Sequence, residues 1–241
     1  MDEALQAGGS AELPSSCLYA LAAARAGCPY INFTPSAGAT PKAIARRFEE
    51  AGLPHAGRDG KTGETLVKSV LAPMFAIRNL RVRSWTGQSI LGNDDGAVLA
   101  DPASRESKVR SKSALLPGIL GYAPEAHVGI DRVRSLGDWK VAWDFIHFQG
   151  FLGTSMRMQF TWEGCDSILA APLVLDLVRL VACAHRAGDS GPLGALSVFF
   201  KDPLASEEHS LVPQFNDLLD YVERLEKALG VSTPAFAKRF G

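Results

Sequence analysis

The middle of the chain contains three consecutive stretches of strand-type sequence, and they restrict the fold more than any other feature. His127 to Val133, Val141 to Phe148 and Ser155 to Trp162 each alternate apolar and polar residues or concentrate aromatic ones. Gly150 and Gly153 separate the second stretch from the third, as expected of a hairpin. We therefore predict an antiparallel sheet over these residues.

The sequence on either side of this β-rich middle alternates helix and strand patterns. A short β-type run, Tyr30 to Phe33, lies between a helix pattern over Leu18 to Ala26 and a second helix that Pro41 opens. Asp166 to His185 is apolar nearly all round, which predicts a helix enclosed by protein. A last helix is expected at about His209 to Leu229. The flanks are therefore of α/β type, whereas the middle is of α+β type.

Composition excludes several classes of partner. Lys and Arg number 25 and Asp and Glu 26, so the net charge of -1 provides no basic field for nucleic acid or an anionic membrane. The first ten residues lack the pattern of a signal peptide, and the longest apolar run, Ile168 to Leu175, is shorter than the roughly 18 residues of a membrane span. We expect a cytoplasmic protein that binds neither nucleic acid nor membrane.

The four scattered cysteines argue against zinc and disulfides, and the metal requirement stays unknown.

Three basic residues form the first candidate site. Arg105, Lys108 and Lys112 have the spacing i, i+3 and i+7, so a helix would place all three cations on one face. Such like charges repel, and a bound anion such as phosphate would offset the repulsion. The alternative is a solvated basic face that Glu106 and Asp101 balance.

A second candidate lies at a predicted helix start. In Thr62-Gly63-Glu64-Thr65, free backbone N–H groups and the positive end of the helix dipole can hold a phosphate, with Thr62 as the N-cap. An ordinary helix cap, in which Gly60 and Gly63 serve only the turn, explains the same pattern. The polar segment Leu91 to Gly96 either holds sugar hydroxyls or a cation, or is a plain turn.

Two further lysines lie beside apolar segments. Lys201 follows the run Leu196 to Phe200, and Lys140 precedes a predicted strand. Burial lowers the pKa of a lysine, which suits it to proton transfer, although the side chain can also extend to solvent.

Seven blocks of sequence, in this order, resemble the myo-inositol-1-phosphate synthase family in its bacterial and archaeal form. The resemblance covers Ser15 to about Leu204, and several colinear blocks are far more specific than any one alone. The blocks are YINFTPS (30–36), GRDGKTGETLVKS (57–69), ILGNDDG (90–96), SKVRSK (107–112), GDWKVAWDF (137–145), CDSILAAPLVLDL (165–177) and FFKDPL (199–204).

The resemblance implies an isomerase of inositol biosynthesis that converts D-glucose 6-phosphate to 1D-myo-inositol 3-phosphate. Bound NAD oxidises C5, a proton leaves C6, the enolate attacks C1 in an aldol step, and NADH reduces C5 again. Such a reaction needs cations for the oxyanions, a proton shuttle and a phosphate clamp. A homotetramer is expected by the same resemblance.

The resemblance also assigns roles to individual residues. Lys201 would transfer a proton at C5, Lys108 would lie near the carbonyl that accepts the aldol attack, and Asp138 would orient Lys140. All four lysines would converge on one pocket. The implied catalytic residues are Lys108, Lys112, Lys140, Lys201 and Asp138; the implied substrate-binding residues are Thr62, Gly63, Glu64, Thr65, Asn93 and Asp95; and the implied cofactor-binding residues are Thr34, Asp59 and Asp166.

The fold that the resemblance implies is an incomplete Rossmann-like domain with an inserted catalytic and tetramerisation domain. The inserted domain would be built on a mainly antiparallel sheet, like the C-terminal domain of glyceraldehyde-3-phosphate dehydrogenase. We expect residues 1–60 to be the remnant of the Rossmann-like domain, 61–164 the catalytic and oligomerisation domain, and 165–241 helices that return to the first.

The chain departs from the family pattern in two places. Ser89 stands where relatives usually carry an asparagine, which removes an amide donor. Nothing before Pro14 resembles the strand, glycine-rich turn and helix that hold the pyrophosphate of NAD. The chain is thus either an enzyme part that acts with a separate N-terminal NAD-binding fragment, a non-catalytic assembly module, or a sugar-phosphate-binding module without redox chemistry.

Overall fold

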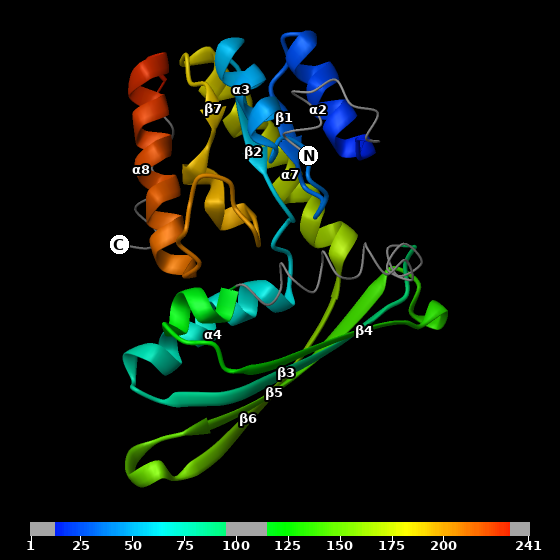
Figure 1. The fold of residues 1–241 in the computed structure, drawn as a ribbon, viewed down its shortest axis with the longest axis vertical. Coiled ribbons are helices and arrows are strands. Elements are labelled where there is room, and N and C mark those ends of the chain that lie inside the picture. The colour runs from blue at the N-terminus through cyan, green and yellow to red at the C-terminus, as the bar shows by residue number, and fades with distance from the viewer. Residues whose placement is uncertain (1–12, 95–114, 232–241) are drawn as a thin grey trace. The chain divides into compact units, whose positions relative to one another are not determined.

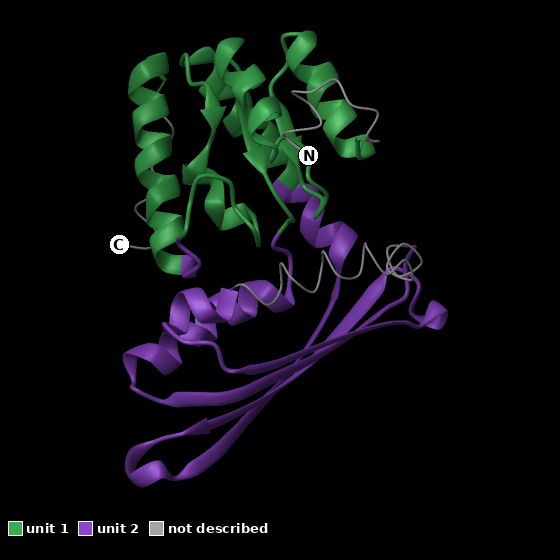
Figure 2. Cartoon of the chain, viewed as in Figure 1, with its two compact units in different colours: residues 1–60, 174–207, 212–241 green, residues 61–173, 208–211 purple. Residues whose placement is uncertain are grey.

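The computed structural model describes residues 13–94 and 115–231, and the chain divides into two compact units (Figures 1 and 2). Unit 1 comprises residues 1–60, 174–207 and 212–241, and unit 2 comprises residues 61–173 and 208–211. The chain therefore enters unit 2 directly after Gly60. Helices and strands occur in both units, and the α/β plus α+β fold class is confirmed.

Unit 1 contains a parallel sheet of three short strands in the order β1-β2-β7. Strand β1 (Tyr30–Asn32) pairs with β2 (Pro54–Gly57), which pairs with β7 (Gly191–Pro192). Parallel neighbours need a crossover, and helix α3 (Lys42–Glu50) provides it between β1 and β2. The predicted run Tyr30 to Phe33 is confirmed as β1.

Helix α2 (Ser15–Arg25) packs with α3 and contacts β1. Ile44 and Phe48, four positions apart on α3, are fully buried, so α3 turns one apolar face inward. The ring of Phe48 lies 5.0 Å from that of His55. The core here consists of Cys17, Ala20, Ala39, Ile44, Phe48 and Leu53.

Helix α7 (Asp166–Arg186) has the predicted bounds to within one residue but not the predicted surroundings. Only Leu177, Val181 and Ala184 are buried among its side chains, and Ile168 and Leu175 are 72% and 58% exposed. The expectation of a helix enclosed by protein is therefore wrong for this chain, because its apolar residues extend beyond the face that the described residues cover. By length and composition α7 is also apolar enough to cross a membrane, a test that core helices pass as well.

Unit 2 is built on a four-stranded sheet in the order β4-β3-β5-β6. Strands β3 (Arg81–Leu91), β5 (Trp139–Gln149) and β6 (Ser155–Cys165) are antiparallel neighbours, and the short turn η2 (Phe151–Gly153) joins the predicted hairpin. Strand β4 (Glu125–Arg132) instead pairs parallel with β3. The prediction of an antiparallel sheet is thus confirmed except at β4, where the long connection from β3 permits a crossover.

Helix α4 (Glu64–Ile77) lies along one face of this sheet, as Figure 1 shows. Phe75 meets Trp85 of β3 edge-on at 6.1 Å and lies 4.9 Å from Phe148 of β5. The core of unit 2 consists of Ala72, Phe75, Val82, Trp85, Leu115, Leu116, Ile146 and Phe148. Further elements are η1 (Arg134–Leu136), η3 (Gly194–Phe199) and α8 (Leu211–Leu229), and residues 115–120 are also helical.

Candidate functional site

In unit 1, the residues after β2 lie against the residues after η3. The backbone N–H of Lys201 donates to the carbonyl of Asp59 at 2.7 Å, and Arg58 donates to the carbonyl of Asp202 at 2.9 Å. These main-chain bonds bring together two segments that are far apart in the sequence. The Nζ atom of Lys201 then donates to Oδ1 of Asp59 at 2.9 Å, and both side chains are buried. A buried lysine and a buried carboxylate therefore meet at the carboxyl end of a parallel strand.

Thr34 lies next to this ion pair along the sheet. Its carbonyl accepts a hydrogen bond of 3.0 Å from the N–H of Asp59, and its hydroxyl donates to Oδ1 of Asn32 at 2.7 Å. Asn32 is buried at the end of β1 and was not among the predicted site residues. The signal that could have found it is a carboxamide near the end of a β-type run, at the strand end where α/β proteins bind ligands.

In unit 2, two predicted site residues, Thr62 and Lys140, both contact a third, Asp166. Thr62 donates its hydroxyl to Oδ1 of Asp166 at 3.0 Å, and Lys140 donates from Nζ to Oδ2 at 3.3 Å. Asp166 is the first residue of α7, Lys140 lies on β5, and Thr62 lies two positions before the first residue of α4. Lys140 is only 5% exposed, so its side chain does not extend to solvent.

Two expectations about these residues are wrong. Thr62 does not cap α4, because the N-cap residue is Gly63 and no side chain caps the helix. Asp166, not Asp138, is the carboxylate that contacts Lys140; Asp138 is exposed and forms no ion pair with any residue in 13–94 or 115–231. The Thr62 hydroxyl does not bond to the first turn of α4 and donates to Asp166 instead.

The turn Thr62–Thr65 leads into a helix of 14 residues and is buried throughout. A Cβ atom at Gly63 would lie 2.6 Å from Nε1 of Trp162, so only glycine leaves room for that indole. The arrangement places backbone N–H groups of a long helix beside Lys140 and the Thr62 hydroxyl. These are the components that a phosphate site requires.

Behind this turn lies a buried ionic cluster that sequence reasoning missed. Lys68 Nζ is 2.6 Å from Oε1 of Glu64 and 3.0 Å from Oδ1 of Asp144. Ser89 donates to the second oxygen of Glu64 at 2.9 Å, and Trp85 donates from Nε1 to Asp144 at 2.7 Å. The spacing of Glu64 and Lys68 by four positions in a helix was the signal available in the sequence.

Burial and pairing shift the pKa values of this region in different directions. Burial raises the pKa of Asp144, which Lys68 only partly counteracts. Burial alone would lower the pKa of Lys68, but its ion pairs with Glu64 and Asp144 raise it. Burial lowers the pKa of Lys61, which lies beside the turn, to about 8, with Glu208 acting against the shift. Lys61 is thus a further titratable group at the site that the sequence did not single out.

Of the remaining predicted residues, the structure describes Asn93 but not Lys108, Lys112 or Asp95. Asn93 follows β3, and its Oδ1 atom is buried without a hydrogen-bond partner in the described part of the chain. Lys108, Lys112 and Asp95 lie outside the described residues. Lys140 belongs to unit 2 and Lys201 to unit 1. Within residues 13–94 and 115–231, no group of three or more His, Cys, Asp or Glu could hold a metal ion.

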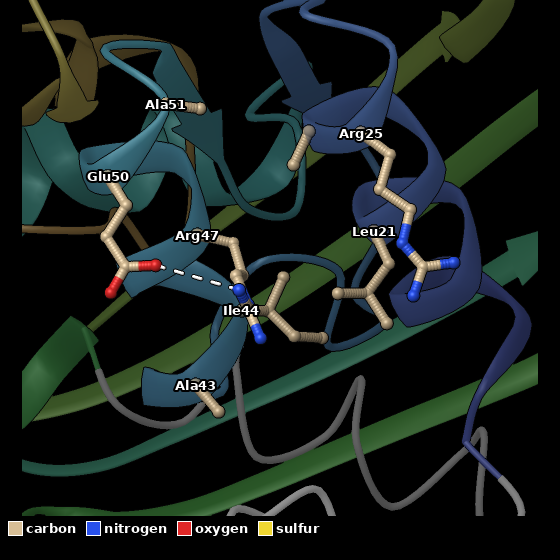
Figure 3. Close-up of a pocket in the computed structure, with 8 residues that line it drawn as sticks. Leu21, Arg25, Ala43, Ile44, Arg47, Glu50 and Ala51 are labelled. Carbon is tan, nitrogen blue, oxygen red and sulfur yellow. Dashed lines mark ion pairs between the residues drawn. The ribbon is translucent and has the colours of Figure 1, made fainter.

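A cavity of about 510 Å³ lies between α2 and α3 (Figure 3). Figure 3 shows the ion pair between Arg47 and Glu50 among its lining residues. The lining residues are Leu21, Ala24, Arg25, Ala43, Ile44, Arg47, Glu50 and Ala51. No predicted site residue is among them, so this cavity is separate from the candidate site.

The fold and the site define a class of protein. Inositol-3-phosphate synthase from Caenorhabditis elegans superposes on 97% of this chain with a TM-score of 0.80, at 24% sequence identity and over 51% of its own length. A myo-inositol-1-phosphate synthase-related protein from Thermotoga maritima superposes on 96% of the chain with a TM-score of 0.79, at 26% identity and over 61% of its own length. The chain has the fold of the inositol phosphate synthases.

Sequence similarity identifies the family. Residues 63–167 match the family model for myo-inositol-1-phosphate synthase. Inositol-3-phosphate synthase 1 of Bacteroides thetaiotaomicron is 38% identical over 81% of this chain, and the rat protein of the same name is 33% identical over 80%. The chain belongs to the myo-inositol-1-phosphate synthase family. The chain spans only part of these relatives: 47% of the length of the Bacteroides protein and 38% of the length of the rat protein.

Proposed function

We propose that this chain carries the sugar-phosphate-handling part of an inositol-3-phosphate synthase. The proposed reaction converts D-glucose 6-phosphate to 1D-myo-inositol 3-phosphate by oxidation, enolisation, intramolecular aldol cyclisation and reduction, in the cytoplasm, for inositol and phospholipid biosynthesis. The observation that carries the proposal is the contact of Asp166 with both Thr62 and Lys140 at the start of α4.

The turn Thr62–Thr65 would hold the phosphate. Its backbone N–H groups face the ligand without a side-chain cap, and the dipole of α4 favours an anion at this end. Lys140, kept in place by Asp166, would supply the positive charge beside it. Asn93, with its buried oxygen, would accept a hydrogen bond from a sugar hydroxyl.

Lysines would also handle the protons and the negative charge of the reaction. Lys201, fixed by Asp59, would hold or move the proton at the C5 oxygen, and Lys108 would stabilise the carbonyl oxygen that becomes an alkoxide. Lys112 would belong to the same set. The roles of Lys108 and Lys112 rest on the family resemblance.

The described residues fit one end of NAD. Asn32 ends β1, Thr34 follows it and Asp59 follows β2, so polar groups gather at the carboxyl ends of adjacent parallel strands, where nucleotides bind in such sheets. These residues would hold the nicotinamide end, and NAD would supply reversible hydride transfer at C5. The sequence contains no G-x-G-x-x-G pattern for the pyrophosphate, so we propose that a separate N-terminal NAD-binding fragment provides that contact.

A paired measurement tests this function. Calorimetry would measure binding of glucose 6-phosphate and of NAD to the chain, and an assay would follow inositol phosphate with and without the N-terminal part of a relative. We expect glucose 6-phosphate to bind alone, and product to form only on complementation. Glucose 6-phosphate binding without any product under complementation would favour a sugar-phosphate-binding module. Loss of sugar-phosphate binding in Thr62→Val and Lys140→Met, but not in Lys227→Met on α8, would locate the site.

A second candidate function, assembly, is favoured by exposed apolar side chains. Trp139 and Trp143 on β5 are 52% and 39% exposed, and Leu175 and Val178 on α7 are 58% and 53% exposed. Apolar surface of this kind favours association with another chain. We propose a homotetramer, which light scattering would test. A monomer at micromolar concentration would contradict the proposal.

A further inference from the structure

The cluster of Glu64, Lys68 and Asp144 contains three charged side chains that are almost completely removed from solvent. Their exposed fractions are 2%, 3% and 0%. Taking charges out of water is costly unless they are paired and hydrogen-bonded. This cluster adjoins the proposed ligand site, because Glu64 itself belongs to the turn Thr62–Thr65.

The surrounding backbone leaves room for this cluster. A Cβ atom at Gly87 of β3 would lie 3.0 Å from oxygens of both Glu64 and Asp144, and 3.1 Å from Nζ of Lys68. The cluster occupies the space that a side chain at position 87 would fill. Lys68 also lies 5.8 Å from the centre of the Trp85 ring, which adds a favourable cation–π contact.

Glu64 presents an electrostatic problem for the turn. It is the first residue of α4 and belongs to the segment proposed to bind a phosphate, and a carboxylate there would repel the ligand. Both of its oxygens are engaged from within unit 2, one by Lys68 and the other by Ser89. The carboxylate is therefore held by partners within unit 2, and Lys68 offsets part of its charge. Ser89, which stands where relatives usually carry an asparagine, thus holds Glu64 through its hydroxyl.

Asp144 fixes Lys68 in this position. Its Oδ1 atom contacts Lys68 and accepts a hydrogen bond from Trp85. Its Oδ2 atom is buried and has no hydrogen-bond partner among residues 13–94 and 115–231. The ammonium group is thus held between two carboxylates on different elements, α4 and β5, and cannot move toward solvent without leaving one of them unpaired.

We propose that Lys68 is a positioning residue that makes the turn Thr62–Thr65 selective for a dianionic phosphate monoester. By holding and compensating Glu64, Lys68 prevents the carboxylate from repelling the second negative charge of the ligand. Asp144 and Ser89 support Lys68 and Glu64 in this arrangement. The inference rests on the proposed phosphate-binding function of the turn.

The test compares two ligands that differ in charge but share a shape. Glucose 6-phosphate is largely dianionic near pH 8, whereas glucose 6-sulfate is a monoanion, and calorimetry on the full chain gives the ratio of their affinities. We expect Lys68→Met to lower the ratio about tenfold, because an uncompensated charge repels a dianion about twice as strongly as a monoanion. In the double variant Glu64→Gln/Lys68→Met, the carboxylate that would repel the ligand is also removed. We therefore expect the affinity ratio to return to within about threefold of that of the unmodified chain.

The Glu64→Gln variant keeps the inference testable even if Lys68→Met does not fold. Its cluster loses one negative charge and retains Lys68, so we expect it to fold and to bind glucose 6-phosphate at least as tightly as the unmodified chain. Tenfold weaker binding in Glu64→Gln would mean that the carboxylate contacts the ligand, and would overturn the inference. Circular dichroism would confirm that each variant is folded.

Lys227→Met is the matched control, because Lys227 pairs with Glu223 at the same spacing of four positions but on an exposed face of α8. It should leave the ratio unchanged. A folded Lys68→Met variant with the ratio of the unmodified chain would overturn the inference while leaving phosphate binding intact. If the unmodified chain binds neither ligand, the proposed function fails first, and the inference fails with it.

Discussion

Lys201 and Asp59 form a buried ion pair of 2.9 Å although they are 142 positions apart in the sequence. The main-chain bond from Lys201 to Asp59 ties the same two residues a second time. Asp59 adopts a left-handed backbone conformation, with φ of 59°, which is uncommon for a residue other than glycine. Main-chain hydrogen bonds therefore bring these two residues together in addition to the contact between their side chains.

Asp59→Asn should destabilise the protein by about 3 to 5 kcal/mol, because it leaves the ammonium group of Lys201 buried without a counter-charge. Asparagine tolerates the left-handed conformation, so the backbone adds little to this loss. Urea unfolding would measure the change. Glu50→Gln, which removes the exposed partner of Arg46, should cost under about 1 kcal/mol. Equal losses in the two variants would contradict the prediction.

Trp85→Phe should destabilise unit 2 by about 2 to 4 kcal/mol. The substitution leaves a void in the core and removes the hydrogen bond from Nε1 to Asp144. Trp143→Phe is the control, because Trp143 lies on the same sheet but is 39% exposed, and it should cost about 1 kcal/mol or less. Thermal unfolding of both variants would measure the difference, and a larger loss at position 143 would rule the explanation out.

Stability should fall as the pH falls from about 6.5 to about 4, owing to His55. Burial lowers the pKa of His55 to about 4, and neither ring nitrogen has a hydrogen-bond partner in residues 13–94 and 115–231. The unfolded chain binds a proton at higher pH than the folded chain does, so the stabilisation is complete above pH 6.5 and is lost toward pH 4. The loss should reach about 2 to 3 kcal/mol.

His55→Leu should flatten this dependence, because the variant has no group to titrate at that position. Urea unfolding at several values between pH 4 and pH 7 would give the profile. His185→Gln on the exposed end of α7 should leave the slope as it is in the unmodified chain. An unchanged slope in His55→Leu would show that other groups cause the acid sensitivity.

Asp166→Asn should weaken binding of glucose 6-phosphate by about tenfold to a hundredfold, because Thr62 and Lys140 lose the charged acceptor that orients them. Asp176→Asn on the same helix removes only an exposed contact with Arg179 and should leave the affinity as it was. Calorimetry with both variants checks the prediction. Equal affinities would show that Asp166 does not organise the site.

Local sequence patterns predicted most of the helices and strands. The position of Pro41 located α3, and the glycines between β5 and β6 located their hairpin. The start of α4 beside the turn Thr62–Thr65 was also predicted, because helix-start signals act over a few residues. The parallel pairing of β4 with β3 was not, since strand direction depends on a connection whose path no local pattern encodes.

The sequence by itself determined the family, the start of helix α4, and which lysines border apolar elements. Only the tertiary structure decided the partners of those lysines: Asp166 for Lys140, Asp59 for Lys201, and both Glu64 and Asp144 for Lys68. The reason is physical. Apolar spacing and turn preferences act between near neighbours in the chain, whereas a buried charge pairs with whichever opposite charge the packed strands and helices bring within reach.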